Sequence, residues 1–302
     1  MNDAVHVPPG SFPLVSVIVA AYNSAEFLPR CLESIATQSF RNFEAIVVNS
    51  SHEDRTAQVV SRFSPVRFVQ SAKRLLPHAA MNAGVEEARG ALLVFTSADT
   101  RAEPGWLASL VASHELGHQV IGGSIDTEAK SRISRGIQIL KYSPYLRGKP
   151  AGPLTVAASG NMLVSRKAWE LVGPFDGSIY SGDALFSWKA RKEGLIPWYE
   201  PEAVVYDLDE RYRKGFLLGR FQRGKEFGKV RAAFEEWTTA WRILGIVCAP
   251  LAAISALAKS GRECHRARRL ADFVATIPFQ VAAQAAWSAG EAFGYFRRIP
   301  AA

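Results

Sequence analysis

Cysteine is scarce, and no metal-binding cysteine pattern is present. The 302 residues include three cysteines, Cys31, Cys248 and Cys264, which are widely spaced and form no C-x-x-C pair. This odd, scattered set excludes a disulfide framework and a cysteine-based zinc site, and it is typical of a reducing compartment. We therefore expect all three to be buried small hydrophobic side chains.

Several other signals are missing. Residues 1–13 lack the basic start and apolar run of a secretory signal, so we expect a flexible N-terminus and a catalytic part that stays in the cytoplasm. The chain contains no internal repeat and no low-complexity segment. It also has no zinc finger, no basic region with heptads and no aromatic-interleaved RNA motif, so we predict no nucleic-acid partner.

The formal net charge of +8 nevertheless indicates an anionic partner. Two basic clusters flank the apolar segments of the C-terminal third, a distribution that favours the headgroups of an anionic membrane surface. The first cluster contains Arg211, Arg213, Lys214, Arg220, Arg223, Lys225, Lys229 and Arg231, and the second contains Lys259, Arg262, Arg266, Arg268 and Arg269.

Short β-branched runs alternate with helical patterns through the first two-thirds of the chain. This alternation predicts βαβ units and a Rossmann-like, mostly parallel sheet flanked by helices, with ligands at the carboxyl ends of its strands. The predicted strands cover residues 15–20, 43–48, 66–69, 91–96, 162–164 and 203–206, and the predicted helices cover 25–38, 56–63, 78–89, 166–172 and 183–193.

Ordered motifs between about residues 15 and 231 resemble the family-2 glycosyltransferases, which have the GT-A fold. Each motif is weak by itself, but their order along the chain matches that family. The motifs are VSVIVAAYNS (15–24), EAIVVNSSHEDRT (44–56), NAG and ARG (82–84, 88–90), FTSADT (95–100), and the acceptor-side segments GNM (160–162), GPFD (173–176) and SGDALFSW (181–188).

The resemblance implies a GT-A domain over 14–235, with a nucleotide half at about 14–125 and an acceptor half at about 155–235. Its activity would be transfer of one sugar from a nucleotide diphosphate sugar to an acceptor hydroxyl, with inversion at the anomeric carbon. The Gln-x-x-Arg-Trp signature of polymerising relatives is missing, which favours single-sugar transfer. The thinning of acidic residues relative to the family leaves an alternative, a catalytically weak, membrane-bound nucleotide-sugar-binding or scaffold protein.

The nucleotide-binding residues implied by the resemblance follow the predicted strands. The family's aspartate near 49 and 50 is replaced by neutral residues, so either Glu53 or Asp54 substitutes, or Asp54 caps the next helix. Arg74 and His78 either contact the diphosphate or form an exposed basic pair. The expected nucleotide-sugar-binding residues are Ala21, Tyr22, Asn23, Ser50, Arg74, Ser97 and Asp99.

The family's Asp-x-Asp position reads Ser97-Ala-Asp99 in this chain. The resemblance makes Asp99 a ligand of Mg²⁺ or Mn²⁺, which bridges diphosphate oxygens. The alternative is a loop aspartate that caps the turn before Pro104. Asp207 either supplies the missing metal carboxylate or caps and pairs with the neighbouring arginines.

Asp183 is the predicted general base, because it matches the aspartate of the family's Glu-Asp pair, whose glutamate is Gly182 here. The alternative, a helix N-cap, is compatible with this role, since a cap also aims a carboxylate. The resemblance places Gly160, Asn161, Gly182 and Trp188 on the acceptor side, with core packing as the alternative for Trp188.

Residues 236–302 form a predicted apolar helical hairpin. The run 241–258 is about 27 Å long as a helix, near the hydrocarbon thickness of roughly 30 Å, but Pro250 would kink it. Because both flanks are basic, the positive-inside tendency favours a hairpin in one leaflet or at the interface over two spans. We therefore expect a place at the cytoplasmic face of the inner or plasma membrane and a saccharide or lipid-linked acceptor; the alternative is a soluble helical appendage.

Overall fold

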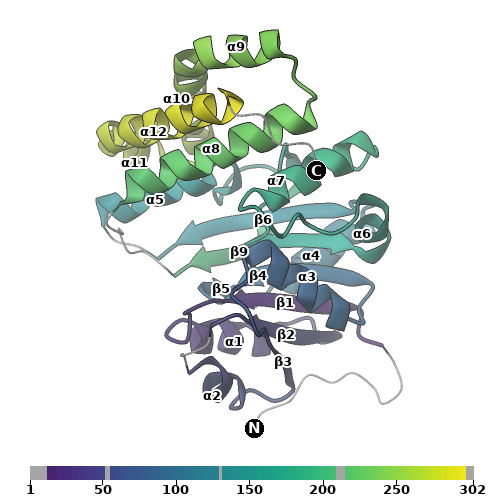
Figure 1. The fold of residues 1–302 in the computed structure, drawn as a ribbon. Coiled ribbons are helices and arrows are strands. Elements are labelled where there is room, and N and C mark those ends of the chain that lie inside the picture. The colour runs from purple at the N-terminus through teal and green to yellow at the C-terminus, as the bar shows by residue number, and fades with distance from the viewer. Residues whose placement is uncertain (1–11, 52–54, 129–130, 209–214, 297–302) are drawn as a thin grey trace. The chain divides into compact units, whose positions relative to one another are not determined.

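The computed structural model describes residues 12–51, 55–128, 131–208 and 215–296 (Figure 1). The chain divides into two compact units. Unit 1 contains residues 1–128 and 150–209, and unit 2 contains residues 129–149 and 210–302. Most of the predicted N-terminal segment 1–13 lies outside the described residues.

The first half of the sheet in unit 1 is parallel, as predicted. Four strands pair in the order β3-β2-β1-β4; the residues of β1, β2 and β4 are almost all buried, whereas those of the edge strand β3 are mostly half-buried. Every pair among them is parallel. Burial on both faces explains why these segments read as continuous apolar runs. The strands are β1 (Val15–Ala21), β2 (Phe43–Asn49), β3 (Val66–Gln70) and β4 (Leu92–Ser97).

The second half of the sheet is mostly antiparallel, so the sheet as a whole is mixed. After β4, the chain turns at residues 98–99 and enters the short strand β5. This strand does not pair with β4 but lies at the opposite edge of the sheet, beside β9. Only one pair in this half, β6 with β9, is parallel. The strands are β5 (Thr100–Ala102), β6 (Val120–Thr127), β7 (Gly152–Pro153), β8 (Asn161–Ser165) and β9 (Trp198–Asp207).

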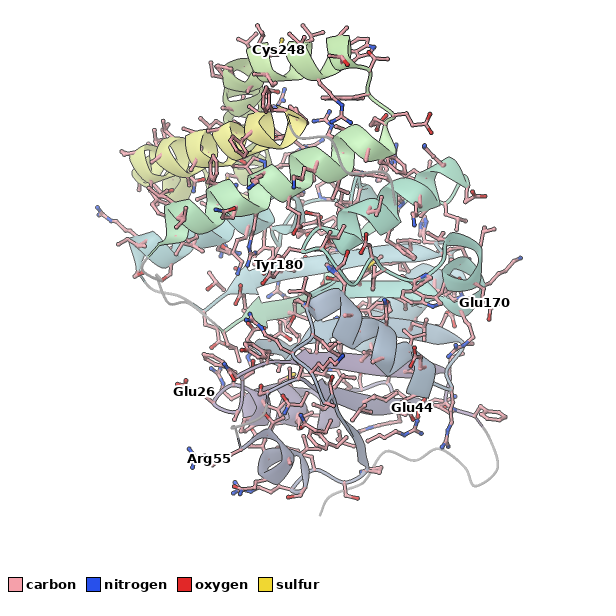
Figure 2. All side chains as sticks on the ribbon, in the orientation of Figure 1. Glu26, Glu44, Arg55, Glu170, Tyr180 and Cys248 are labelled. Atoms are coloured by element: carbon pink, nitrogen blue, oxygen red, sulfur yellow. The ribbon has the colours of Figure 1, made fainter. Side chains whose placement is uncertain are left out.

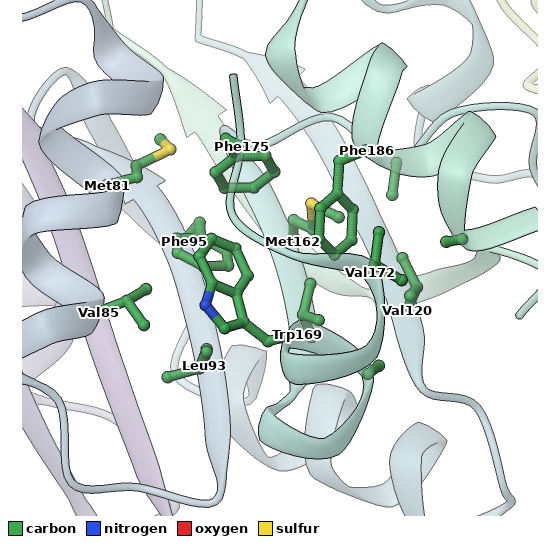
Figure 3. Close-up of a cluster of buried hydrophobic side chains, with 14 of the residues drawn as sticks. Met81, Val85, Leu93, Phe95, Val120, Met162, Trp169, Val172, Phe175 and Phe186 are labelled. Carbon is green, nitrogen blue, oxygen red and sulfur yellow. The ribbon is translucent and has the colours of Figure 1, made fainter. Parts of the chain in front are cut away.

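Helices cover the sheet, and one of them approaches it very closely. A Cβ on Gly84 would overlap the side chain of Ile18 on β1, so the glycine lets α3 pack directly on the strand. Beside it, Phe95, Trp169, Phe175 and Phe186 form a buried aromatic cluster (Figure 3). The helices of unit 1 are α1 (Leu28–Ala36), α2 (Thr56–Val60), α3 (Pro77–Glu87), α4 (Trp106–Glu115), α6 (Arg166–Val172) and α7 (Gly182–Lys192).

Unit 2 is helical. A glycine seam lets α8 and α12 meet backbone to backbone, because a Cβ on Gly224 or Gly290 would overlap the facing helix. This seam explains why α8 belongs to unit 2, whereas the sequence places the domain boundary after residue 235. The elements are α5 (Arg132–Tyr142), the 3-10 turn η1 (Ser143–Tyr145), α8 (Phe216–Phe234), α9 (Thr239–Val247), α10 (Ala249–Arg266), α11 (Leu270–Ala275) and α12 (Ile277–Phe296).

The predicted apolar run 241–258 is broken near Pro250. Helix α9 ends at Val247 and α10 begins at Ala249, with a bend of 62° between them. Within the described ranges, no single helix has the length and apolar character to cross a bilayer, and only α9 and α10 together meet that test. Cys31 and Cys264 are buried as expected, but Cys248, at the bend, is half-buried (Figure 2).

Candidate active site

Three parallel strands end side by side and bring most of the predicted nucleotide-binding residues together. In the sheet, Ala21 is paired with Asn49, and Ala20 is paired with Ser97. The backbone amide of Ser50 donates to the carbonyl of Ala21 at 3.1 Å. The polar residues that follow β1, β2 and β4 therefore lie at one edge of the sheet, as the fold class predicts.

The turn after β1 is held by the loop after β2. The backbone amide of Asn23 donates to Ser51 Oγ at 2.6 Å, and Asn23 adopts a positive φ of 51°, which asparagine tolerates better than most residues. This turn leaves the Tyr22 ring exposed, with the guanidinium of Arg74 4.5 Å from the ring centroid. Tyr22 and Arg74 thus form a cation–π pair at this edge of the sheet.

A neutral amide, Asn49, and a hydroxyl, Ser50, occupy the positions near which the family carries an acidic residue. Asn49 Nδ2 donates to Gln70 Oε1 at 3.0 Å, and Gln70 Nε2 donates to the carbonyl of Ser51 at 2.9 Å. Asn49 and Ser50 are both buried. The alternative acids Glu53 and Asp54 lie outside the described residues.

The sheet register places the two candidate metal-binding aspartates beside each other. Thr100 is paired with Asp207, and the amide of Leu208 donates to the carbonyl of Asp99 at 2.8 Å.

Burial, reinforced by the nearby negative charge of Asp99, raises the pKa of the Cys31 thiol to about 12.

The donor set at this edge suits a hard divalent ion that takes its other ligands from phosphate and water. Carboxylate oxygens are the ligands that Mg²⁺ and Mn²⁺ prefer. Across the described parts of the chain, no group of three or more His, Cys, Asp or Glu side chains is placed to hold a metal. The described residues therefore place the carboxylates of Asp99 and Asp207 at this edge, without a third His, Cys, Asp or Glu side chain to complete a protein-only metal site.

Asp183 is fixed on both sides of its carboxylate. It lies in the first turn of α7, whose N-cap is Ser181. Its Oδ1 accepts from the backbone amide of Ala184 at 2.8 Å, and its Oδ2 accepts from the backbone amide of Ser159 at 3.2 Å. The side chain remains 23% exposed, so the carboxylate is aimed by the backbone and still open to an acceptor.

A path of contacts links Asp183 with the metal-binding turn. Ser159 precedes Gly160, and the carbonyl of Gly160 accepts from Thr96 Oγ1 at 3.1 Å. Thr96 precedes Ser97, whose carbonyl accepts from Thr100 Oγ1 at 2.7 Å. The predicted base and the predicted metal-binding turn are thus connected, within unit 1, by hydrogen bonds and adjacent residues.

Asn161, predicted on the acceptor side, is instead a structural residue. It is completely buried, its Nδ2 donates to the carbonyls of Ser124 and Ala203 at 2.8 Å, and its Oδ1 accepts from Trp106 Nε1 at 2.7 Å. These carbonyls flank the register shift between β6 and β9. Asn161 therefore satisfies backbone groups that the irregular strand pairing leaves over.

Trp188, also predicted on the acceptor side, lies five residues after Asp183 on α7. It is half-buried and does not belong to the buried aromatic cluster that Phe186 joins. Gly182, the third of these residues, lies between Asp183 and the N-cap.

For His78, the structure overturns the predicted exposed basic pair and places the ring beside Asp183. Its side chain is neither exposed nor paired with Arg74, because the residue is 3% exposed and its Nε2 receives the backbone amide of Asp183 at 3.2 Å. No sequence motif indicates a functional role for Ser159. The one signal that pointed to this arrangement is the glycine at 182, where the family carries an acid.

Comparisons with known proteins identify the family that the chain matches. Residues 16–172 match the family described as "Glycosyl transferase family 2". Glycosyltransferase AglE of Haloferax volcanii is 26% identical over 224 residues, covering 70% of this chain and 74% of that protein. An undecaprenyl-phosphate 4-deoxy-4-formamido-L-arabinose transferase of Pseudomonas fluorescens is 31% identical over 122 residues, covering 38% of this chain and 36% of that enzyme.

Solved structures show the same fold. The mannosyltransferase PcManGT from Pyrobaculum calidifontis, in complex with GDP-Man and Mn²⁺, superposes with a TM-score of 0.58 at 17% identity, covering 91% of this chain and 89% of that one. The matched family residues 16–172 include all of β1 except Val15, the candidate metal-binding turn and Gly160. The chain belongs to glycosyl transferase family 2 and is a glycosyltransferase with the GT-A fold.

Proposed function

We propose that this enzyme transfers a single sugar from a nucleotide diphosphate sugar to an acceptor hydroxyl, with inversion and with Asp183 as general base. The observation that carries the proposal is the contact path from Asp183 through Ser159 and Gly160 to the turn of Ser97 and Asp99. This path connects the partly exposed carboxylate of Asp183, which would accept a proton, with the strand ends where GT-A enzymes bind the donor.

The donor occupies the edge formed by the ends of β1, β2 and β4. Ala21, Asn23 and Ser50 supply backbone and hydroxyl groups for the nucleoside. The guanidinium of Arg74, held by Tyr22, faces the negative diphosphate. The crystallised neighbour with GDP-Man supports a nucleotide-sugar donor.

Asp99 and Asp207 would hold the divalent ion. When bound, Mg²⁺ or Mn²⁺ neutralises charge on the departing diphosphate. The Mn²⁺ in the PcManGT complex supports this assignment.

The acceptor step is a direct displacement. The acceptor oxygen forms a bond to the anomeric carbon as the bond to the diphosphate oxygen breaks, and its proton passes to Asp183. The backbone amides of Ala184 and Ser159 hold the Asp183 carboxylate in one orientation, so the base enters the reaction already oriented.

Unit 2 supports an acceptor at a membrane surface. Helix α9 has no buried residue, and Val247, Leu251 and Ile254 are 69%, 66% and 63% exposed. Exposed apolar side chains at this density mark an interaction surface. The named lipid phosphate of the Pseudomonas relative supports a lipid-linked acceptor.

Basic residues complete the amphipathic character of these helices. Lys259, Arg262 and Arg266 are exposed near the end of α10, where anionic headgroups would attract them. Following the positive-inside tendency, we place the enzyme at the cytoplasmic face of the membrane, lying on it rather than spanning it.

The test is transfer by the full chain from a panel of UDP-, GDP- and dTDP-sugars, with Mg²⁺ or Mn²⁺. Acceptors are undecaprenyl phosphate in vesicles with anionic lipid, and free saccharides. We expect one donor to give a product of inverted anomeric configuration, read by NMR. Retained configuration would overturn the direct displacement, and nucleotide binding without transfer on every combination would contradict the proposed activity.

A further inference from the structure

We propose that His78 is a positioning residue for Asp183 and that its imidazole takes the place of the acidic side chain missing at position 182. The inference rests on the proposed function, because it assigns His78 a role through the general base. It concerns a buried histidine in the first turn of α3, a different element from the one that carries Asp183.

Both ring nitrogens of His78 have polar partners. Nδ1 lies 3.3 Å from the carbonyl of Ile179. Nε2 lies 3.1 Å from Ser159 Oγ and 3.2 Å from the backbone nitrogen of Asp183. The ring also contacts Phe175, with centroids 5.0 Å apart, so one face rests on the aromatic cluster of the core.

These partners select one neutral form of the ring. A carbonyl oxygen only accepts, so Nδ1 carries the hydrogen and donates to Ile179. Nε2 is then the acceptor, and it receives both the backbone amide of Asp183 and the hydroxyl of Ser159.

His78 contacts both segments that position the Asp183 carboxylate: the backbone of Asp183 itself and Ser159. His78 binds the backbone of Asp183 directly, and it binds the hydroxyl of Ser159, whose backbone amide donates to Asp183 Oδ2. Asp183 Oδ1 lies 3.9 Å from His78 Nε2, too far for a hydrogen bond. The ring therefore orients the carboxylate without using its lone pairs.

Position 182 shows that the imidazole and a side chain there exclude each other. A Cβ on Gly182 would lie 2.7 Å from His78 Cγ and 2.8 Å from His78 Nδ1, closer than real Cβ contacts allow. In this chain, the space beside the base is filled from α3 instead of from α7. An anionic neighbour is thereby replaced by a neutral hydrogen-bond acceptor.

Substitutions at His78 separate positioning from packing. Gln places an oxygen acceptor near the Nε2 position, whereas Asn reaches only the Nδ1 position and Leu offers no acceptor. We expect His78→Asn and His78→Leu to lower kcat about 10- to 100-fold, with the donor KM changed less than about threefold. His78→Gln should recover most of the lost kcat. His114→Leu is the matched control, since His114 also binds a carbonyl, that of His118, outside the site.

The decisive comparison is made in the Asp183→Asn background. If His78 acts through Asp183, adding His78→Leu to Asp183→Asn causes no further loss of kcat. Wild-type kcat in His78→Asn, or losses that multiply in the double variant, would overturn the inference and leave the base assignment intact. Full activity of Asp183→Asn by itself would instead overturn the proposed base. Should the Leu variant fail to fold, the Asn and Gln pair carries the same test.

Discussion

The replacement of Asn161 by leucine should destabilise unit 1 severely. Leucine has nearly the same shape but cannot bond to Ser124, Ala203 or Trp106. The two carbonyls and the indole N–H are left in a region where Asn161, Trp106 and Ser124 have no exposed surface. Water therefore has no ready access to replace the lost partners.

The expected loss of unfolding free energy can be estimated from the three polar groups that lose their partner, the carbonyls of Ser124 and Ala203 and the indole N–H of Trp106. Each buried polar group left without a partner costs about 1–3 kcal/mol, so we expect a loss of roughly 3–6 kcal/mol after partial relaxation. Since natural domains have about 5–15 kcal/mol of stability, this loss approaches the total. The midpoint of thermal unfolding should fall by roughly 10 °C or more.

Urea and thermal unfolding, followed by tryptophan fluorescence, measure the loss. Asn42→Leu is the control, because Asn42 is exposed and accepts one bond, from the Leu14 amide at 3.2 Å. An Asn161→Leu protein within about 1 kcal/mol of wild type would refute the structural role. If its stability were preserved while kcat fell, an acceptor-side role for Asn161 would be restored.

Three further outcomes are expected. Arg74→Ala should raise the donor KM about tenfold with a smaller change in kcat, because the variant removes the cation held over Tyr22; an unchanged affinity for nucleoside diphosphate, measured by calorimetry, would contradict this. Asp99→Asn should abolish stimulation by Mn²⁺ or Mg²⁺, and EDTA should inhibit the wild type but barely affect the variant; equal metal dependence of both proteins would remove Asp99 from the metal site. Burial and the charge of Asp99 raise the pKa of the Cys31 thiol from 9.0 to about 12. Above pH 9 the unfolded state therefore loses a proton that the folded state keeps. The free energy of unfolding should then fall as the pH rises from about 9 to 12. Cys31→Ala should show a smaller fall over that window in urea titrations, and an identical pH dependence would place the loss elsewhere.

The parallel half of the fold was predictable because its strands and helices are indicated by patterns within short stretches of sequence. Runs such as 15–20 and 43–48 are apolar on both faces, and the helical patterns between them leave little choice but βαβ units. The antiparallel half was not predictable in the same way. The short strands β5 and β7 contain three and two residues and carry no periodicity.

The candidate site divides along the same line. Residues that follow strands, such as Tyr22, Ser50 and Asp99, could be placed because the ends of parallel strands meet at one edge. Asn161 and His78 could not, because their partners lie on distant elements: 37 residues separate Asn161 from Ser124, and 105 separate His78 from Asp183. Only the three-dimensional structure shows that Asn161 serves a strand irregularity and that His78 borders Gly182.

The most direct test of the account is single-turnover transfer by Asp183→Asn, with the donor and acceptor identified for the wild type. Asparagine keeps the shape and one acceptor oxygen but cannot take the acceptor's proton. The account predicts a fall in the transfer rate of roughly 10²- to 10⁴-fold, with affinity for the nucleotide within about threefold of wild type. A variant that transfers sugar within about threefold of the wild-type rate would contradict the role of Asp183 as the base.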